Sequence, residues 1–195
     1  AYAWAYCMAA ETAAGVAGPP RAAWLRALGL ERERIANHLG DLGFIGNDAG
    51  LGFGLAQFSR LKEDWLRTNA AAFGHRYLMD LIVPGGVARD VAGDGWSRMA
   101  VELDTLERDV RRLKSIYEDH AGLQDRFINC GRVTPALAAK LGLTGLAGRA
   151  SGQAWDARVQ FPVAPYDRLE VRMATHRNGD VAARVIVRFE EVLES

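Results

Sequence analysis

The segment MAVELDTLERDVRRLKSIY, residues 99–117, decides the fold class. Its apolar residues recur every three or four positions, and charged residues occupy most positions between them. This spacing predicts a long amphipathic helix with a coiled-coil-like seam, of the kind that packs in helical bundles. The seam consists of Met99, Leu103, Leu106, Val110, Leu113 and Tyr117.

The same periodicity predicts two more long helices earlier in the chain. The first follows Pro19-Pro20 and reaches about residue 45, and the second follows a glycine-rich break at residues 47–54. A shorter alanine-rich helix precedes them and ends at Gly15. The expected buried residues are Trp24, Leu28, Ile35, Leu39 and Leu42 in the first long helix and Phe58, Leu61, Trp65 and Phe73 in the second.

After Gly142 the pattern changes from helical spacing to alternation. Residues 157–163 and 168–173 alternate apolar with polar side chains, which predicts two half-buried strands. Asp180 then follows a turn and can serve as the N-cap of a final helix. We therefore expect a mainly α-helical (α+β) protein: a helical bundle core over 1–141, a small β-hairpin or sheet near 145–175 within a region 142–178, and the start of a further helix over 179–195.

Composition limits the classes of function. The chain has 195 residues, 49% of them hydrophobic and 25% charged, which suits one globular domain with at most an appended subdomain. Its 24 Lys and Arg residues balance 24 Asp and Glu residues, so no overall positive field is present to recruit nucleic acid. Because the chain starts without Met and both ends lie in helical patterns, we expect it to be a fragment of a longer subunit.

Four polar residues share one side of the first long helix. Glu31, Arg34, His38 and Asp41 are spaced three, four and three residues apart, which places them in one column beside the apolar face. Groups next to a core need buried or interfacial partners. The column is therefore either an ion-pair network that ties helices together or a set of proton-handling groups, in which His38 can change charge near neutral pH.

Two other residues stand out near glycines. Asp48 lies on the glycine-rich break, where a turn or helix-capping role competes with a functional one. Arg149 lies in GLAGRASG, residues 145–152, where it can bind an anion or a carboxylate, although the segment has neither P-loop nor dinucleotide-binding spacing. Cys7, Cys130 and the four histidines show no metal-ligand spacing.

Four blocks of the chain resemble one family, in order and over nearly the whole length. They are PPRAAWLRALGLERERIANHLGDLGFIGNDAG (19–50), GHRYLMDLIVPGGVARD (74–90), LGLTGLAGRASGQAWDAR (141–158) and RNGDVAARVIVRFEEVLES (177–195). Together they resemble the middle of the large subunit of membrane-bound, hydrogenase-3-type nickel-iron hydrogenases. They also resemble the homologous 49-kilodalton subunit of respiratory complex I.

The resemblance implies roles for particular residues. Glu31, Arg34 and His38 match the family's ExxRxxxH pattern, and Asp48 matches an aspartate that hydrogen-bonds a quinone-site histidine in the complex I branch. Arg149 falls in an RASG block near the buried cofactor side. On this basis Glu31, His38 and Asp48 are candidates for proton transfer or for lining a cavity, and Arg149 is a candidate cofactor-side residue.

The resemblance also implies cofactors and partners. In the hydrogenases two CxxC pairs hold nickel and iron, and both pairs fall outside this chain, so we expect no cofactor and no turnover in the fragment itself. The parent would be a hydrogenase with a nickel-iron centre, paired with an iron-sulfur small subunit. It would also contact membrane-bound subunits indirectly, on the cytoplasmic side of the membrane. The alternatives are a quinone-reducing subunit of a complex I-like enzyme and a non-catalytic assembly or interaction domain.

Overall fold

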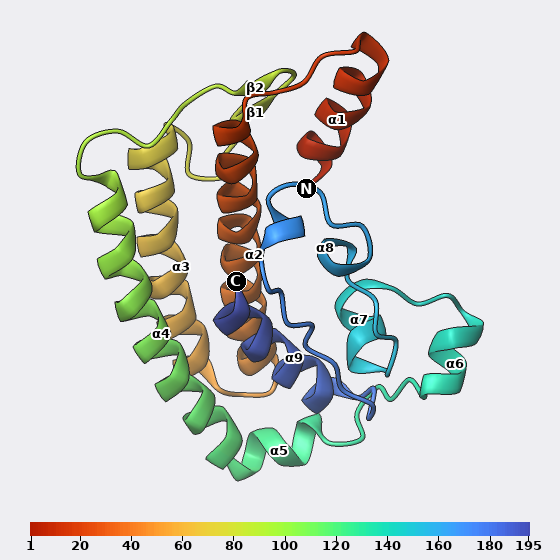
Figure 1. Ribbon diagram of the computed structural model, residues 1–195. Helices are drawn as coiled ribbons and strands as arrows, with labels where there is room; N and C mark the ends of the chain where they lie inside the picture. The colour runs from red at the N-terminus through yellow and green to blue at the C-terminus, as the bar shows by residue number, and fades with distance from the viewer.

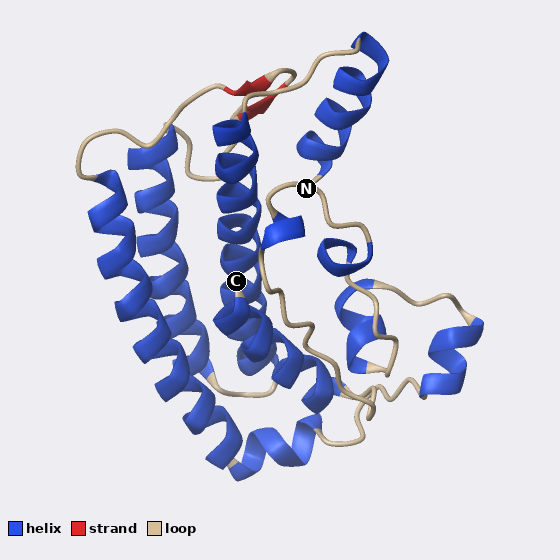
Figure 2. Cartoon of the chain, viewed as in Figure 1, coloured by secondary structure: helices blue, strands red, loops and turns tan.

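The computed structural model describes residues 1–195 and consists mainly of helices (Figures 1 and 2). Three long helices lie side by side: α2 (Pro20–Asp48), α3 (Gly52–Phe73) and α4 (Gly95–Asp119). A connection of three residues makes α2 and α3 an antiparallel pair, and α4 packs on the other side of α3. The prediction of a mainly α-helical fold is confirmed.

The shorter helices lie on the α2 side of these three and at the end of α4 (Figure 1). They are α1 (Tyr2–Ala14), α5 (Ala121–Phe127), α6 (Pro135–Lys140), α7 (Gly145–Ala150), α8 (Ala157–Gln160), the 3-10 turn η1 (Tyr166–Arg168) and α9 (Val181–Glu194). The predicted end of the first helix at Gly15 is confirmed, since Gly15 adopts the left-handed conformation that terminates α1. The last helix, α9, returns to pack against α2, so the end of the chain lies beside its first long helix (Figure 1).

One apolar core joins α2, α3, α4, α5 and α9. Near its end, Tyr117 of α4 donates a hydrogen bond from its hydroxyl to the carbonyl of Leu42 over 2.8 Å. Side chains at Gly46 and Gly54 would collide with that hydroxyl, so both glycines are needed for the tyrosine to enter between α2 and α3. Burial raises the pKa of Tyr117 to about 12, which keeps the hydroxyl protonated as a donor.

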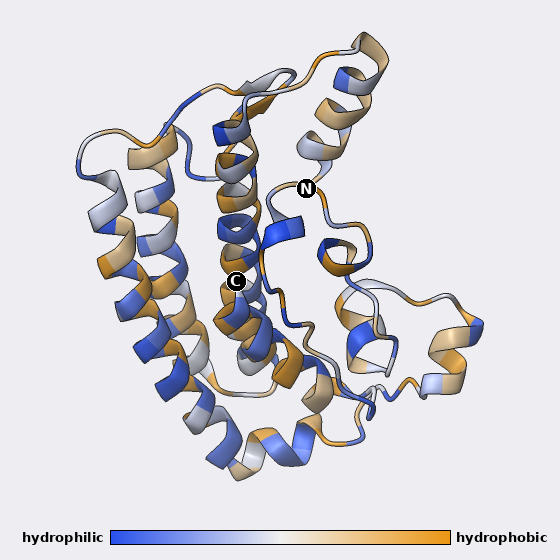
Figure 3. Ribbon diagram, in the orientation of Figure 1, coloured by the Kyte–Doolittle hydropathy of each residue, from blue (hydrophilic) through white to orange (hydrophobic).

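Two predicted core positions are wrong, and in both the helix is rotated slightly from the expected face. Trp24 is 48% exposed because the neighbouring Leu25 takes the inward position in α2. Leu103 is 45% exposed because α4 turns Glu102 inward, where it pairs with the buried Arg32 at 2.9 Å. Figure 3 shows that polar and apolar residues alternate along these helices.

The small sheet lies elsewhere than predicted. Its two antiparallel strands, β1 (Ile82–Val83) and β2 (Gly86–Val87), form a short hairpin before α4. The hairpin predicted near residues 145–175 is absent, and that stretch forms α7, α8, η1 and loops (Figure 2). The alternation there has another cause: Arg158 is buried in ion pairs, whereas Val159 and Phe161 point to solvent.

None of the helices combines the length and the apolar character that crossing a bilayer requires.

Candidate functional site

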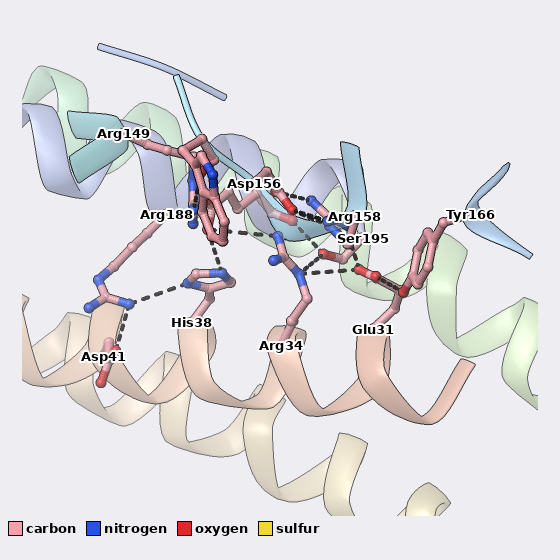
Figure 4. A network of polar contacts seen from close by, with 12 residues as sticks. Glu31, Arg34, His38, Asp41, Arg149, Asp156, Arg158, Tyr166, Arg188 and Ser195 are labelled. Carbon is pink, nitrogen blue, oxygen red and sulfur yellow. Dashed lines mark hydrogen bonds and ion pairs between the residues drawn. The ribbon is translucent and has the colours of Figure 1, made fainter. Parts of the chain in front are cut away.

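A connected set of buried and half-buried polar groups lies between α2, α9 and the segment from α7 to η1 (Figure 4). We call it the α2–α9 network. Its column on α2 contacts side chains that come from more than a hundred residues further along the chain. The network consists of Glu31, Arg34, His38, Asp41, Arg149, Asp156, Arg158, Tyr166, Arg188 and Glu191.

Local structure explains how these side chains meet. On α2, the spacing of three and four residues stacks the column on the side that faces α9. On α9, Arg188 and Glu191 are three residues apart and face α2. Asp180 fixes the start of α9 because its Oδ1 accepts the Ala183 N–H at 2.8 Å. The cap thereby helps to set the position of the α9 side chains.

Glu191 is the centre of the network, with its side chain 3% exposed. Its Oε1 accepts a hydrogen bond from Arg149 Nε at 2.5 Å, and its Oε2 lies 3.0 Å from His38 Nε2. Burial alone would raise the pKa of Glu191, but the hydrogen bonds from His38 and Arg149 outweigh it and lower that pKa to about 2. The carboxylate is therefore ionised at neutral pH.

His38 is held at both ring nitrogens. While Nε2 faces Glu191, Nδ1 lies 3.3 Å from Nη1 of Arg188. Burial lowers the pKa of His38, and the charges of Arg34 and Arg188 lower it further, against the opposing effect of Glu191. The imidazole is consequently neutral at pH 7.

Glu31 forms a second centre, one helical turn before Arg34. Its Oε2 accepts from Arg158 Nη1 at 3.0 Å, and its Oε1 accepts from the hydroxyl of Tyr166. The same Oε2 forms an ion pair with Arg34 Nε at 3.2 Å, while that N–H donates its hydrogen bond to Oγ of Ser195. Arg158 also forms two side-chain hydrogen bonds with Asp156, of 2.9 and 3.2 Å. Burial and the adjacent Glu31 carboxylate raise the pKa of Tyr166, so its hydroxyl stays a donor.

Charges in the network balance. Four carboxylates, on Glu31, Asp41, Asp156 and Glu191, face four guanidinium groups, and His38 is neutral. Those guanidinium groups belong to Arg34, Arg149, Arg158 and Arg188. This balance offsets part of the cost of burying the charges, while Nη2 of Arg34, Nε of Arg188 and Oε2 of Glu191 have no hydrogen-bond partner.

The structure separates the candidate residues into two places. Glu31, His38 and Arg149 belong to one network, as the expectation of buried partners for the column requires. Asp48 is the last residue of α2, is exposed, and its side chain takes part in no hydrogen bond or ion pair. Ten residues separate it from His38, which is about 15 Å along a helix axis. Asp48 is therefore no part of the network.

Sequence reasoning missed half of the network. Glu191, Arg188, Asp156, Arg158 and Tyr166 were not identified as a group because they lie on elements distant in sequence. One signal was available on α9, where Arg188 and Glu191 border the apolar residues of an amphipathic helix, as the column does on α2.

The donor set does not fit a nickel-iron centre, which needs several thiolates. Cys7 is buried in α1, Cys130 is exposed between α5 and α6, and no group of three or more His, Cys, Asp or Glu side chains could hold a metal ion. Arg149 is the residue expected on the cofactor side. Its guanidinium is already used by Glu191 and by the carbonyl of Trp155, at 3.2 Å.

Fold and network together define a mainly α-helical domain in which buried ion pairs join a helix from the first part of the chain to the last helix. Residues 48–195 match the family described as "Respiratory-chain NADH dehydrogenase, 49 Kd subunit". The chain belongs to this family.

The chain is similar to members of both branches that its sequence resembles. It is 35% identical to the carbon monoxide-induced hydrogenase of Rhodospirillum rubrum, over 97% of this chain and 53% of that protein. It is 31% identical to an NADH-quinone oxidoreductase subunit of Granulibacter bethesdensis, over 98% of this chain and 48% of that protein. The chain thus spans about half the length of these two relatives.

A solved structure shares the fold. It is that of the membrane-bound sulfane sulfur reductase, described as an archaeal respiratory membrane complex, with a TM-score of 0.85 and 27% identity. The match covers 92% of this chain and 48% of that one. Proteins with differing names, hydrogenase, quinone oxidoreductase and sulfane sulfur reductase, are therefore similar to this helical domain.

Proposed function

We propose that this chain is the central helical domain of the large subunit of a hydrogenase-3-type nickel-iron hydrogenase. The complete enzyme, which we call the parent, interconverts protons and H2. The observation that carries the proposal is the buried α2–α9 network, with the carboxylate of Glu31 and the imidazole of His38 on one face of α2. The similarity to the hydrogenase of R. rubrum supports this branch of the family.

Within the parent, the domain acts as a scaffold and as part of a proton path. The nickel-iron centre, bound outside this chain, supplies the redox chemistry of H2. Glu31 and His38 are the groups of this domain that take up and release protons in that path, as carboxylates and imidazoles can. The path is not continuous in this chain, because Arg34 lies between Glu31 and the Glu191–His38 contact and its guanidinium does not release a proton. The isolated chain is inactive.

The domain assembles with an iron-sulfur small subunit and lies on the cytoplasmic side of the membrane, where membrane-bound subunits anchor the complex. Support comes from the fold that this chain shares with part of a respiratory membrane complex.

The test uses the complete parent complex. We expect Glu31→Gln to lower the rate of H2 production by about a hundredfold, the usual size of a lost acid–base contribution, and to shift its pH profile. His38→Gln and Asp48→Asn are measured in the same way. Asp104→Asn, an exposed residue of α4 outside the network, is the control and should leave both unchanged. If all three variants keep the native rate and pH profile, the proposal that these residues take part in proton transfer is wrong.

A second candidate function is quinone reduction, which one observation favours. Asp48 is exposed at the α2–α3 turn, and Phe44 and Phe53, four residues before it and five residues after it in the chain, are 59% and 50% exposed. Exposed aromatic rings can pack against a quinone ring, and the carboxylate can accept a hydrogen bond from a histidine that binds the headgroup, as the resemblance to the complex I branch implies. Assays of the purified parent separate the two functions, since bound nickel with H2 turnover supports the hydrogenase. Quinone-dependent electron transfer without nickel supports the alternative.

A further inference from the structure

His38 has a different kind of partner on each side of its ring. Nε2 is 3.0 Å from Oε2 of Glu191, and Nδ1 is 3.3 Å from Nη1 of Arg188 (Figure 4). Arg188 is itself held by Asp41, with 2.5 Å between Nη1 and Asp41 Oδ2. The ring is buried, so water does not compete freely for either nitrogen.

These contacts select one protonation state. A guanidinium only donates hydrogen bonds, so Nδ1 facing Arg188 must accept and carries no proton. The ionised Glu191 can only accept, so the Nε2 that lies 3.0 Å from its Oε2 carries the proton, and the contact is electrostatic because Oε2 receives no hydrogen bond in this geometry. The neutral imidazole with its proton on Nε2 is the one state that satisfies both neighbours.

We propose that Arg188 is a positioning residue that holds His38 as the neutral Nε2–H tautomer, and that the His38 contact is thereby an acid-sensitive latch between α2 and α9. Protonation of Nδ1 would place an N–H against the N–H of Arg188, turning an attractive contact into a repulsive one. The same event would add a fifth positive charge to a network that is balanced when His38 is neutral.

Every element packed around the ring contributes to this balance. On α2 the facing charges are Arg34 and Asp41, and on α9 they are Arg188 and Glu191. Arg149 of α7 acts through its hydrogen bond to Glu191. Glu191 alone favours a protonated ring, whereas burial, Arg34 and Arg188 oppose it, and the pKa of His38 falls below its ordinary value.

The sign of the pH effect follows from the lowered pKa. Because the unfolded chain binds a proton at His38 more readily than the folded chain, the latch contributes its full stability above the unfolded pKa of about 6.5. That stability is lost as the pH falls below this value. Glu191 loses its contribution in a separate range, between about pH 4.5 and its folded pKa of about 2.

This device goes beyond the proposed function, because it concerns the state of the chain itself and holds whether or not the parent moves protons. The latch is therefore tested by NMR and by unfolding, whereas the proton path is tested by the rate of H2 production. Failure of one proposal does not imply failure of the other.

The first measurement is 15N NMR of the histidine rings in the 195-residue chain, with the His38 signals identified by their loss in His38→Gln. We expect a proton on Nε2, none on Nδ1, and titration below the ordinary histidine range. In Arg188→Gln the titration midpoint should move upward, because one opposing charge is removed. Should that variant fold poorly, Asp41→Asn keeps Arg188 but removes its counter-charge, and the midpoint should then fall further. His38 protonated on Nδ1, or a midpoint that neither variant moves, would overturn the proposal.

The second measurement is the unfolding equilibrium of the chain between pH 7 and pH 5. The unfolding constant should rise by up to about tenfold for each pH unit below about 6.5. His38→Gln should remove this rise, since a glutamine amide can donate to Glu191 and accept from Arg188 but does not titrate. The control is His75→Gln. His75 lies outside the network, where its Nδ1 accepts the backbone N–H of Tyr77 in a turn. A rise that persists in His38→Gln contradicts the latch.

Discussion

Glu191 shows how one buried side chain can join three elements. Its carboxylate links α9 to His38 on α2 and to Arg149 on α7, and nearly all of it is inaccessible to solvent. A charge in this position is tolerated because its neighbours supply hydrogen bonds and opposite charge. The adjacent Glu190 is exposed and has no such contacts, so the two neighbouring glutamates form a natural comparison.

We expect Glu191→Gln to lower the free energy of unfolding by about 3 kcal/mol at pH 7, because Arg149 would remain buried without its counter-charge. Glu190→Gln should change it by less than about 0.5 kcal/mol. Chemical denaturation of both variants at pH 7 gives the comparison, and equal effects would mean that the Glu191 pairs contribute nothing.

Single residues also explain the main error in the sequence prediction. Alternation after Gly142 indicated strands, on the assumption that apolar side chains point inward. In the structure the inward group is Arg158, which pairs with Glu31 and Asp156, while Val159 is 40% exposed. A buried ion pair inverts the pattern, and nothing in the local sequence reveals that its partner lies on α2.

At the scale of elements, the helices were predictable because their apolar faces repeat over many turns. The prediction that Asp180 caps the final helix is confirmed, and the same side chain also accepts the backbone N–H of Asn129 at 2.9 Å. The seam of α4 was right except at Leu103, where Glu102 turns inward to reach Arg32. Periodicity gives the face of a helix to within one residue, and in α4 the polar partner Arg32 decides which residue turns inward.

The double role of Asp180 leads to a prediction about α9. Asp180→Ala should lower the free energy of unfolding by about 2 kcal/mol, because the helix loses its cap and the backbone N–H of Asn129 loses its acceptor. Asp180→Asn keeps one acceptor oxygen, so its loss should be smaller. Thermal and chemical unfolding of the two variants measures the difference, and an alanine variant as stable as the asparagine variant would rule out a capping role.

At the scale of the whole molecule, a second polar connection spans the three long helices. The guanidinium of Arg32, on α2, lies over the ring of Trp65 at 3.7 Å and bonds Asn69, both on α3. It then reaches Glu102 on α4 at 2.9 Å. Burial raises the pKa of Glu102 and lowers that of Arg32, against the effect of the partner in each case. One arginine therefore links all three helices through direct contacts.

We expect Glu102→Leu to destabilise the fold by about 3 kcal/mol, because Arg32 would be left buried without its counter-charge. The double variant Arg32→Met with Glu102→Leu should recover much of this loss, since an apolar pair of similar volume often replaces a buried ion pair at little cost. A double-mutant cycle measured by denaturation tests the coupling. Additive losses would show that the two residues act independently.

How much of the molecule could be foreseen differs between fold and site. The bundle and its family followed from motifs that are continuous in sequence. Of the site, the sequence provided the α2 column and Arg149, because their neighbours in the chain mark them. The remaining half of the network depends on how α9 and the 149–166 segment cross α2, which local patterns do not encode.

The α2–α9 network and the Arg32–Glu102 pair both join the first half of the chain to the second. Between those halves lies the loop before α4, where Ala92, Gly93 and Asp94 are exposed. Loops of this kind are where proteases cut most readily. The peptide bonds there are not what holds the halves together, since each half supplies one side of the core and one side of both polar connections. A chain nicked at this loop would remain a single particle of two tightly associated pieces.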